Sequence, residues 1–220
     1  MKRGYFSLIL VTAIFAELIT SCDKIDDDTA VGMTISGTLE FSERYNDEFT
    51  KLVMVVREPM DMGVIVFKRV ELARGTYFDG AFSIELPATI DEKYLQTFFT
   101  EDIPPKFKVS DKGVKTGIFS ISISSFKDKE DLPDMPGVGI GQLYQEYELI
   151  YAKSDDKSTT EALLYYADRK CSITGTIGND TFSVNLKRGW NFLFAIETEL
   201  IKEYSTYPVS GLKWYVSGDF

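Results

Sequence analysis

Alternation of apolar and polar residues is the main pattern along this chain. From residue 119 to 124, phenylalanine and isoleucine alternate with serine, and the same period of two recurs in the segments 33–41, 82–86, 171–177, 182–186 and 212–216. Successive side chains of a strand point to opposite faces, so this period indicates antiparallel strands with one apolar and one polar face. The chain is therefore expected to be rich in β-structure.

Other segments break this alternation. Residues 52–56 and 64–67 are apolar throughout, which predicts central strands covered on both faces. Residues 89–99, after Pro87, form the one segment that is expected to be helical, over about two turns. Residues 128–141 hold two prolines and three glycines and are expected to form a long loop. Its segment Gly137–Gly141 lacks the spacing of a dinucleotide fingerprint and is interpreted as structural.

Turn-forming residues separate the expected strands. Asp79-Gly80 and Gly178-Asn179-Asp180 lie between alternating segments and predict tight hairpins. Arg74-Gly75 and Arg188-Gly189 predict two further turns. About ten short strands with such punctuation favour an all-β fold, an antiparallel β-sandwich of immunoglobulin-like or transthyretin-like kind. A barrel is the alternative.

A division near Pro104-Pro105 would leave two parts of similar size, residues 32–104 and 105–220. Each part opens with a related tetrapeptide, Ile-Ser-Gly-Thr from Ile35 and Ile-Thr-Gly-Thr from Ile173. The two parts are expected to be either halves of one sandwich or two tandem small sandwiches.

Two resemblances accompany this division. The segments 35–39 and 80–84 faintly resemble transthyretin-like sandwiches of secreted bacterial proteins. The segments 171–175 and 186–191 resemble modules of uncharacterised lipoproteins from gut-type bacteria. Neither resemblance implies an activity.

The beginning of the chain has the layout of an export signal. Lys2 and Arg3 precede an apolar segment from Tyr5 to Ala16, which is too short for a comfortable membrane span. Ile19-Thr20-Ser21-Cys22 follows and resembles the lipobox of bacterial lipoproteins, although Glu17 is a departure from the usual apolar flank. The resemblance implies cleavage before Cys22 and a diacylglyceryl group, with acyl chains such as palmitate, on its sulfur. Residues 1–21 are accordingly interpreted as a signal peptide.

An acidic segment, Asp-Lys-Ile-Asp-Asp-Asp, follows Cys22 directly. Such a segment buries no apolar surface, so residues 22–31 are expected to form a lipidated, solvated tether. The segment also resembles the acidic export tags of surface lipoproteins in some Gram-negative bacteria. The expected location is the outer membrane, and both its cell-surface side and its periplasmic side stay open.

Charge narrows the range of partners. The chain has 24 basic and 34 acidic residues, and without Lys2, Arg3 and Glu17 the mature part has 22 and 33, a formal charge of −11. Nucleic acid is an unfavourable partner for such a chain, because binding to phosphates needs a basic patch. The net charge also argues against electrostatic docking on anionic lipid, and no large basic cluster appears along the sequence.

The inventory of reactive side chains argues against an enzyme. There is no histidine, and Cys171 is the one cysteine besides Cys22. Histidine-dependent catalysis and zinc binding are therefore excluded, and no cofactor other than the lipid is expected. Cys171 shares the apolar positions of its strand and is expected to be buried. Calcium is conceivable at three acidic places, Asp131 with Asp134, Asp155-Asp156 and Asn179-Asp180, although solvated loops are the favoured interpretation.

Aromatic residues crowd the second half of the chain. Trp190 and Trp214 occupy apolar positions and are assigned to the core, whereas Tyr204, Tyr207 and Tyr215 are the candidate ligand-binding residues. The sequence favours a membrane-anchored, non-catalytic binding or adhesion module for a glycan or a protein. A structural or accessory subunit of an envelope assembly is the alternative, and a glycosidase with two unnamed carboxylates is the third.

Overall fold

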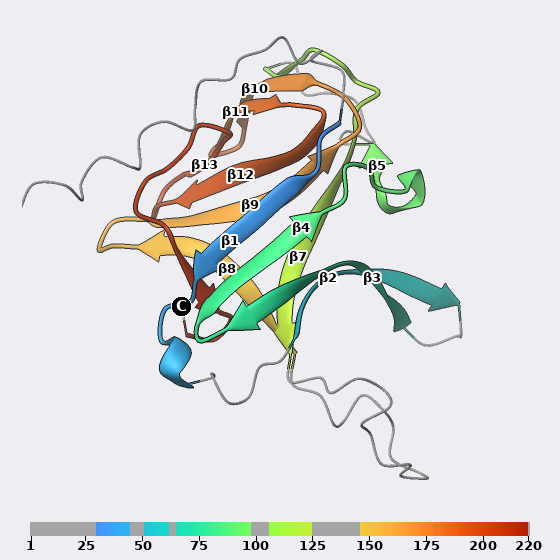
Figure 1. Ribbon diagram of the computed structural model, residues 1–220. Coiled ribbons are helices and arrows are strands. Elements are labelled where there is room, and N and C mark those ends of the chain that lie inside the picture. Colours follow the sequence, from blue (N-terminus) through green and yellow to red (C-terminus); the bar gives the residue numbers. More distant parts are fainter. Residues whose placement is uncertain (1–29, 45–50, 62–64, 98–105, 125–145, 220) are drawn as a thin grey trace, which may run out of the picture.

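The described part of the chain is built from strands, as expected for an all-β protein. The computed structural model describes residues 30–44, 51–61, 65–97, 106–124 and 146–219 (Figure 1). For residues 51, 55–61, 65–69, 124 and 146 it describes the backbone path alone. The strands are β1 (Met33–Thr38), β2 (Lys51–Asp61), β3 (Ile65–Phe78), β4 (Ala81–Leu86), β5 (Gln96–Thr97), β6 (Lys108–Val109), β7 (Lys115–Ser124), β8 (Glu146–Ser154), β9 (Thr159–Ala167), β10 (Cys171–Ile177), β11 (Asp180–Leu186), β12 (Gly189–Glu197), β13 (Lys202–Ser205) and β14 (Lys213–Val216).

The prediction of a two-turn helix at residues 89–99 is wrong, because the helical part is much shorter. Within the described part of this segment the chain makes a single 3-10 turn, η2 (Glu92–Tyr94), and then enters β5. The Asp91 carboxylate accepts a hydrogen bond from the backbone N–H of Lys93 at 3.1 Å, which caps the turn. Leu95 is already extended, with φ −108° and ψ 144°. Residues 98 and 99 lie outside the described part. A second 3-10 turn, η1 (Ser42–Arg44), follows β1.

Both expected hairpins are confirmed. Asp79 and Gly80 form the two-residue loop between β3 and β4, with φ values of 47° and 78°. Positive φ at both central residues is the geometry that Asp-Gly favours, because it matches the twist of the flanking strands. Gly178 and Asn179 form the two-residue loop between β10 and β11, where Gly178 alone has a positive φ, of 60°. The turn expected at Arg188-Gly189 is also confirmed, and Gly189 has a φ of 93°.

The turn expected at Arg74-Gly75 is wrong, because both residues lie inside β3. Gly75 is paired with Leu52 of β2 on one side and with Ile84 of β4 on the other. A Cβ atom at Gly75 would lie 2.3 Å from the carbonyl oxygen of Ser83 and 2.8 Å from the Leu52 side chain. The glycine therefore permits a close approach of neighbouring strands rather than a reversal of the chain.

The apolar segment 52–56 belongs to a central strand, as expected. In the sheet β2 lies between β3 and β7, and the side chains of Leu52, Val53 and Met54 are all fully buried. A β-bulge follows these residues: Met54 pairs with Ala73 and Val55 with Glu71, so that Leu72 is the additional residue. Bulges bend a strand and increase its twist, which helps this end of the sheet to curve over the core.

Strands β7, β8 and β9 meet in a three-way junction. Each of these strands pairs antiparallel with the other two. Three strands that are each antiparallel to the other two cannot lie side by side in one flat sheet. Each strand therefore pairs with one partner along its first half and with the other partner along its second half. The first half of β7 pairs with the end of β9, its second half pairs with the beginning of β8, and the end of β8 pairs with the beginning of β9. The junction divides the sheet into packed layers.

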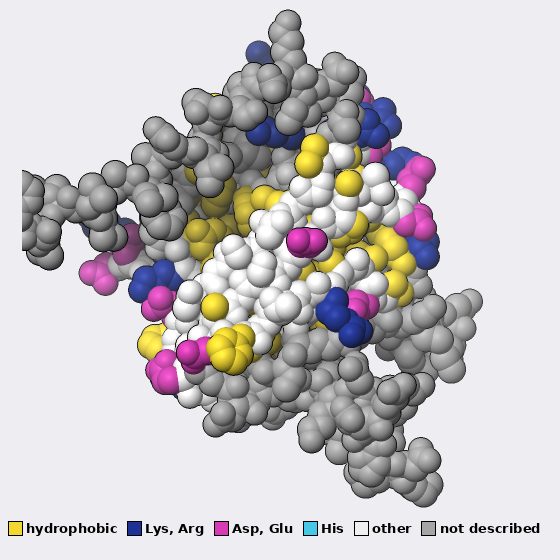
Figure 2. All heavy atoms as spheres, in the orientation of Figure 1, with side chains coloured by type: hydrophobic (Ala, Val, Ile, Leu, Met, Phe, Trp, Pro, Cys, Tyr) yellow, Lys and Arg dark blue, Asp and Glu magenta, His cyan; other side chains and the backbone are white. Residues whose placement is uncertain are grey.

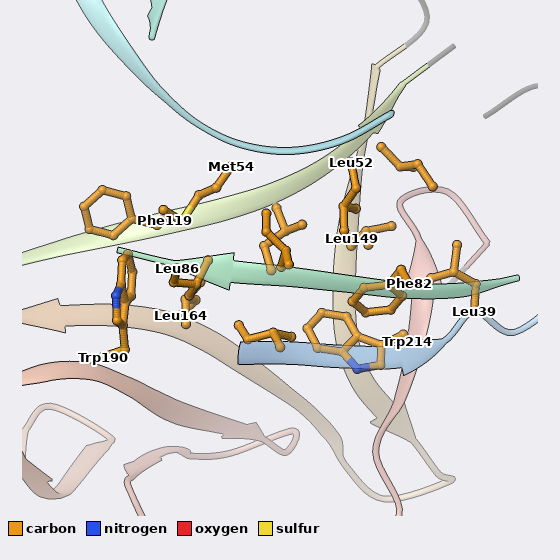
Figure 3. Close-up of a cluster of buried hydrophobic side chains, with 14 of the residues drawn as sticks. Leu39, Leu52, Met54, Phe82, Leu86, Phe119, Leu149, Leu164, Trp190 and Trp214 are labelled. Carbon is orange, nitrogen blue, oxygen red and sulfur yellow. The ribbon is translucent and has the colours of Figure 1, made fainter. Parts of the chain in front are cut away.

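The largest core cluster lies between these layers. It is formed by buried residues from strands at both ends of the chain, including Phe82 of β4, Phe119 of β7, Leu164 of β9 and the two tryptophans, Trp190 and Trp214 (Figure 3). A parallel bridge between Leu39 and Trp214 joins the end of β1 to β14. The strand path β1-β4-β3-β2-β7-β8-β14 therefore returns on itself around this cluster.

A second core cluster covers the opposite face of β9 and β12. Leu164 and Tyr166 of β9 point into the first cluster, whereas Tyr165 and Ala167 belong to the second. Strands β10, β11 and β6 supply most of the remaining second-cluster residues, among them Cys171. Because β9 is covered on both faces, its sequence is apolar almost throughout, Ala-Leu-Leu-Tyr-Tyr-Ala from residue 162 to 167.

The related tetrapeptides at Ile35 and Ile173 occupy equivalent places. β1 pairs with β4 and β10 pairs with β11 in the same register, so Gly37 lies opposite Phe82 and Gly175 lies opposite Phe182. The partner strands are also alike, Phe-Ser-Ile-Glu-Leu in β4 and Phe-Ser-Val-Asn-Leu in β11. A large ring that faces a cross-strand glycine covers the bare backbone, which stabilises such a pair. The repeated sequence therefore forms the same antiparallel pair of strands twice, once as β1 with β4 and once as β10 with β11.

Strands of the segments 32–104 and 105–220 share the first core cluster. Ile35, Phe82 and Leu86 pack in it with Trp190 and Trp214. The segments also share the sheet, through β2 and β7. The expected boundary at Pro104-Pro105 itself lies outside the described residues.

Candidate functional site

The three candidate tyrosines lie at different places in the fold. Tyr204 on β13 is half-buried, and its ring stacks on Phe182 at a centroid distance of 4.7 Å. Tyr207 follows β13 and is 64% exposed. Tyr215 on β14 is half-buried. In the strand order β12, β9 and β8 separate β13 from β14, so the structure does not bring Tyr204 and Tyr215 into one site.

Tyr215 has an aromatic neighbour that the sequence pattern does not single out. The ring of Phe41 lies 6.5 Å from the Tyr215 ring, at an interplanar angle of 45°. Phe41 is 41% exposed, and its φ is 57°. The left-handed conformation costs an L-residue with a bulky side chain about 1–2 kcal/mol. Strained residues of this kind concentrate at functional sites, which makes Phe41 a candidate binding residue.

Charged side chains hold Phe41 in place. The guanidinium of Arg44 lies 4.8 Å from the centre of the Phe41 ring, a cation–π contact. Arg44 also donates a hydrogen bond to the carboxylate of Asp219 at 3.0 Å, and Lys213 donates one to Glu40 at 2.9 Å. This hydrogen bond to Glu40 raises the pKa of Lys213, and the charge of Glu40 adds to the effect. Two ion pairs thus fasten the turn after β1 to the end of the chain.

The β3–β4 hairpin borders the same turn. The backbone N–H of Leu39 donates to the carbonyl oxygen of Gly80 at 2.9 Å, and Gly80 lies against the side chain of Ser42. Phe78, at the tip of this hairpin, is 84% exposed. Figure 2 shows hydrophobic side chains beside acidic ones at this end of the molecule. We call the set of Phe41, Arg44, Phe78 and Tyr215 the Phe41 surface.

The alternating pattern of residues 33–41 assigns Phe41 to the apolar face, with Leu39 before it. Leu39 is buried, at 3% exposure, but the alternation ends there. Glu40 donates its backbone N–H to Trp214 of β14 at 2.8 Å, and the next residue adopts the left-handed conformation. The backbone therefore reverses at Phe41 and turns its ring outward. No local signal in the sequence shows this, because the bond involves a residue that lies 174 positions later.

A small cavity lies in the three-way junction. Glu148 of β8 and Glu161 of β9 line it together with Ser120, whose hydroxyl donates to the Glu148 carboxylate. Its volume is about 50 Å³, whereas ligand pockets usually have several hundred cubic ångströms. A glycosidase needs two carboxylates in a cleft that holds a sugar ring, and a sugar ring does not fit in this cavity.

A wider, open depression lies between the β8–β9 turn and the turn after β12. It has a volume of about 310 Å³ and is lined by Asp156, Lys157, Thr198, Glu199 and Leu200. Asp155, beside it, accepts hydrogen bonds from the backbone N–H groups of Lys157 and Ser158, both at 2.9 Å. These bonds lower the pKa of the Asp155 carboxyl. The lining is polar and holds no aromatic ring, unlike the Phe41 surface.

The remaining candidates are placed as follows. Cys171 is buried at 1% exposure, as expected, and its Sγ lies 3.4 Å from the carbonyl oxygen of Asp111. Trp190 and Trp214 are also buried, which confirms their assignment to the core. In the described ranges no three acidic or cysteine side chains are grouped so that they could hold a metal ion. Cys22, the Asp131–Asp134 pair and Gly137–Gly141 lie outside the described residues.

Comparisons with protein families, with curated proteins and with solved structures find no match for this chain. In the part of the chain that the structure describes, no helix has the length and apolar character needed to cross a membrane.

Proposed function

We propose that this chain is an envelope lipoprotein, anchored through Cys22, whose β-domain binds a ligand without catalysing a reaction. The exposed and strained Phe41 carries this proposal. A phenylalanine in the left-handed conformation weakens folding, and Phe41 is not one of the buried residues of the first cluster. Binding of a partner is a reason for a chain to keep such a residue, because aromatic rings contribute most of the energy at many interfaces.

The composition of the Phe41 surface favours a protein ligand over a glycan. Phenylalanine, tyrosine and arginine are enriched at the centres of protein interfaces. Phe41 and Phe78 have no polar atom on their rings with which to bind sugar hydroxyls. The ion pairs Arg44–Asp219 and Lys213–Glu40 flank them and would form a polar rim. A glycan is the second ligand class.

Replacement of Phe41 by glycine is expected to separate binding from stability. Glycine adopts a φ of 57° without strain, so the free energy of unfolding should stay within about 1 kcal/mol of that of the parent protein. Binding should fall at least tenfold. The measurement is surface plasmon resonance against a panel of host extracellular proteins and a glycan array, with thermal unfolding of the same samples.

Tyr207→Ala is the matched control, because Tyr207 is an exposed aromatic residue outside the Phe41 surface. A ligand that binds Tyr207→Ala normally and Phe41→Gly weakly supports the proposal. A ligand that binds both variants like the parent protein places the binding site elsewhere. Hydrolysis of a polysaccharide or peptide at enzyme-like rates, with one essential carboxylate, would contradict the non-catalytic part of the proposal.

The anchor has its own test. We expect cells that express the full chain to incorporate labelled palmitate into it and to keep it in the membrane fraction. Cys22→Ser should abolish both, because no other thiol is available beside the signal. Protease added to intact cells then distinguishes the two sides of the outer membrane through an epitope placed after Phe220. Palmitate labelling that persists in Cys22→Ser would remove this proposal.

The edge of the sheet favours a second candidate function, a subunit of an envelope assembly. β1 ends the strand order among the described strands, and the bridge from Leu39 to Trp214 lies after its last residue. Residues 33–38, Met-Thr-Ile-Ser-Gly-Thr, contain no proline or charged residue. Natural edge strands usually carry such protection, since an open edge can pair with a strand of another chain. Crosslinking through a cysteine introduced at Thr34 tests this function. A protein that stays monomeric in every crosslinked sample would exclude it.

A further inference from the structure

Three loops gather basic side chains at one end of the fold. The loops are residues 110–115 before β7, 168–170 between β9 and β10, and 187–188 between β11 and β12. Together they contain six basic and two acidic residues, a formal charge of +4 in a chain whose mature charge is −11. In the upper part of Figure 2, lysine and arginine side chains lie beside acidic ones. We call them the basic loops; their basic residues are Lys112, Lys115, Arg169, Lys170, Lys187 and Arg188.

Strand pairing brings the basic loops together. The backbone N–H of Lys115 donates to the Asp168 carboxylate at 2.9 Å, which joins the first loop to the second. Arg169 adds an ion pair with Asp111 at 3.8 Å. Pairing of Cys171 with Leu186 and of Ala167 with Gly189 places the third loop beside the second. The basic side chains come from places up to 76 positions apart, so the sequence shows no basic segment.

Acidic groups among the described residues offset part of the positive charge of the basic loops. Asp111 and Asp168 are the two inside them, and both are engaged by Arg169. Glu92 of η2 forms an ion pair with Lys115. With Glu92 included, the net formal charge of the group is still positive, at +3. Lys112 and Lys187 are exposed, so their charges face outward at this end of the fold.

The chain enters the domain beside the basic loops. A Cβ atom at Gly189, the residue after Arg188, would lie 3.6 Å from the carbonyl oxygen of Val31 and 4.0 Å from the Cα of Ala30. Seven residues separate Ala30 from Cys22. At about 3.5 Å per residue, the fully extended segment spans at most about 30 Å. An acyl anchor at Cys22 would therefore hold the basic loops close to the membrane surface.

We propose that the basic loops dock on anionic phospholipid headgroups and so orient the domain on the membrane. This inference rests on the proposed anchor at Cys22 for the nearness of the membrane. Basic side chains near an anionic surface are attracted over about a Debye length, roughly 8 Å at physiological salt. The Phe41 surface lies at the opposite end of β1 (Figure 1) and would point away from the membrane, toward its ligand.

The acidic tether opposes this docking, so changing its charge is a second way to test the inference. Asp23, Asp26, Asp27 and Asp28 with Lys24 give the tether a formal charge of −3. The tether either is repelled by anionic lipid or competes with it for the basic loops. In both cases, replacing Asp26, Asp27 and Asp28 by asparagine should strengthen binding to anionic vesicles.

The test uses the mature chain with Cys22→Ser, which cannot be acylated, so that binding through the loops is measured alone. Vesicles of equal parts phosphatidylglycerol and phosphatidylcholine are compared with pure phosphatidylcholine vesicles by cosedimentation in 50 mM and 500 mM salt. We expect binding to the anionic vesicles alone, lost in 500 mM salt. Lys187→Glu with Arg188→Glu should weaken it at least tenfold, with unchanged thermal unfolding.

Lys153→Glu with Lys157→Glu is the matched control, since these lysines lie outside the basic loops, and it should bind almost like the parent chain. Equal binding to both vesicle types, equal loss in both double variants, or no binding even with the three tether asparagines would each overturn the inference. The assay does not depend on acylation. A negative vesicle result therefore does not bear on the proposed acylation of Cys22. A negative palmitate result likewise does not bear on binding of the basic loops to vesicles.

Discussion

Trp190→Ala is expected to lower the free energy of unfolding by about 4 kcal/mol, the usual range for loss of a buried tryptophan. Trp190 is 8% exposed. Its ring makes edge contacts with Phe119 at 5.1 Å and Tyr166 at 5.2 Å. The indole N–H also donates to the carbonyl oxygen of Pro87 at 2.7 Å. Trp190 thus joins β12, β7 and β9 to the segment after β4.

Urea denaturation, followed by circular dichroism, measures this effect. Trp190→Phe is the control, because it keeps an aromatic ring and removes the indole N–H. It should cost less, about 1–2 kcal/mol for the unpaired carbonyl and the smaller ring. If Trp190→Ala were as stable as Trp190→Phe, the contribution of the edge contacts would be refuted.

Asn191→Ala is expected to have the second largest effect, about 3 kcal/mol. The Asn191 side chain is buried and accepts a hydrogen bond from the backbone N–H of Lys187 at 2.8 Å. Its amide donates to the carbonyl oxygens of Lys187 and Gly189, both at 2.9 Å. Alanine would leave these three backbone groups without their partner, and each buried group left unsatisfied costs about 1–3 kcal/mol.

Asn185→Ala is the matched control, because Asn185 is an exposed asparagine on β11, the strand that precedes β12 in the sequence. Its replacement should change stability by less than about 0.5 kcal/mol. Hydrogen exchange of the Lys187 backbone amide reports on the same bond directly and should become faster in Asn191→Ala. Unchanged exchange at Lys187 would show that Asn191 does not hold this turn. The turn carries Lys187 and Arg188, so Asn191 also positions part of the basic loops.

Local patterns predict the strands of this protein well and their arrangement poorly. The period of two in residues 119–124 indicates β7, and Asp79-Gly80 indicates the hairpin after β3, because both signals depend on a few neighbouring residues. The three-way junction of β7, β8 and β9 has no such signal. Which half of β7 pairs with which strand is decided by packing between residues that lie 22 to 51 positions apart in the sequence.

Gly75 and Phe41 show the same limit of prediction from local sequence. Gly75 resembles a turn residue in the sequence, yet it lies inside β3 because Ser83 and Leu52 leave no room for a side chain. Phe41 resembles a core residue, yet the bond between Glu40 and Trp214 ends the strand before it. The candidate site is therefore only partly predictable. The sequence points to Tyr215, whereas Phe41 and Arg44 join it through contacts with Tyr215 and Asp219, and Phe78 lies on the neighbouring hairpin.

The direction of β1 has a mechanical consequence. The proposed anchor pulls on β1 from its Met33 end, and a ligand at the Phe41 surface would pull on the residues just after its Thr38 end. Tension between membrane and ligand would then run along this strand. Only the part of the load that a ligand takes up through Phe78, on the hairpin of β3 and β4, would pass from β1 to its partner strand. Because the hydrogen bonds between antiparallel strands lie perpendicular to the strand axis, the six residue pairs of β1 with β4 would carry this part together in shear rather than open one after another. A domain attached in this way should resist detachment by flow better than one that is pulled at a hairpin.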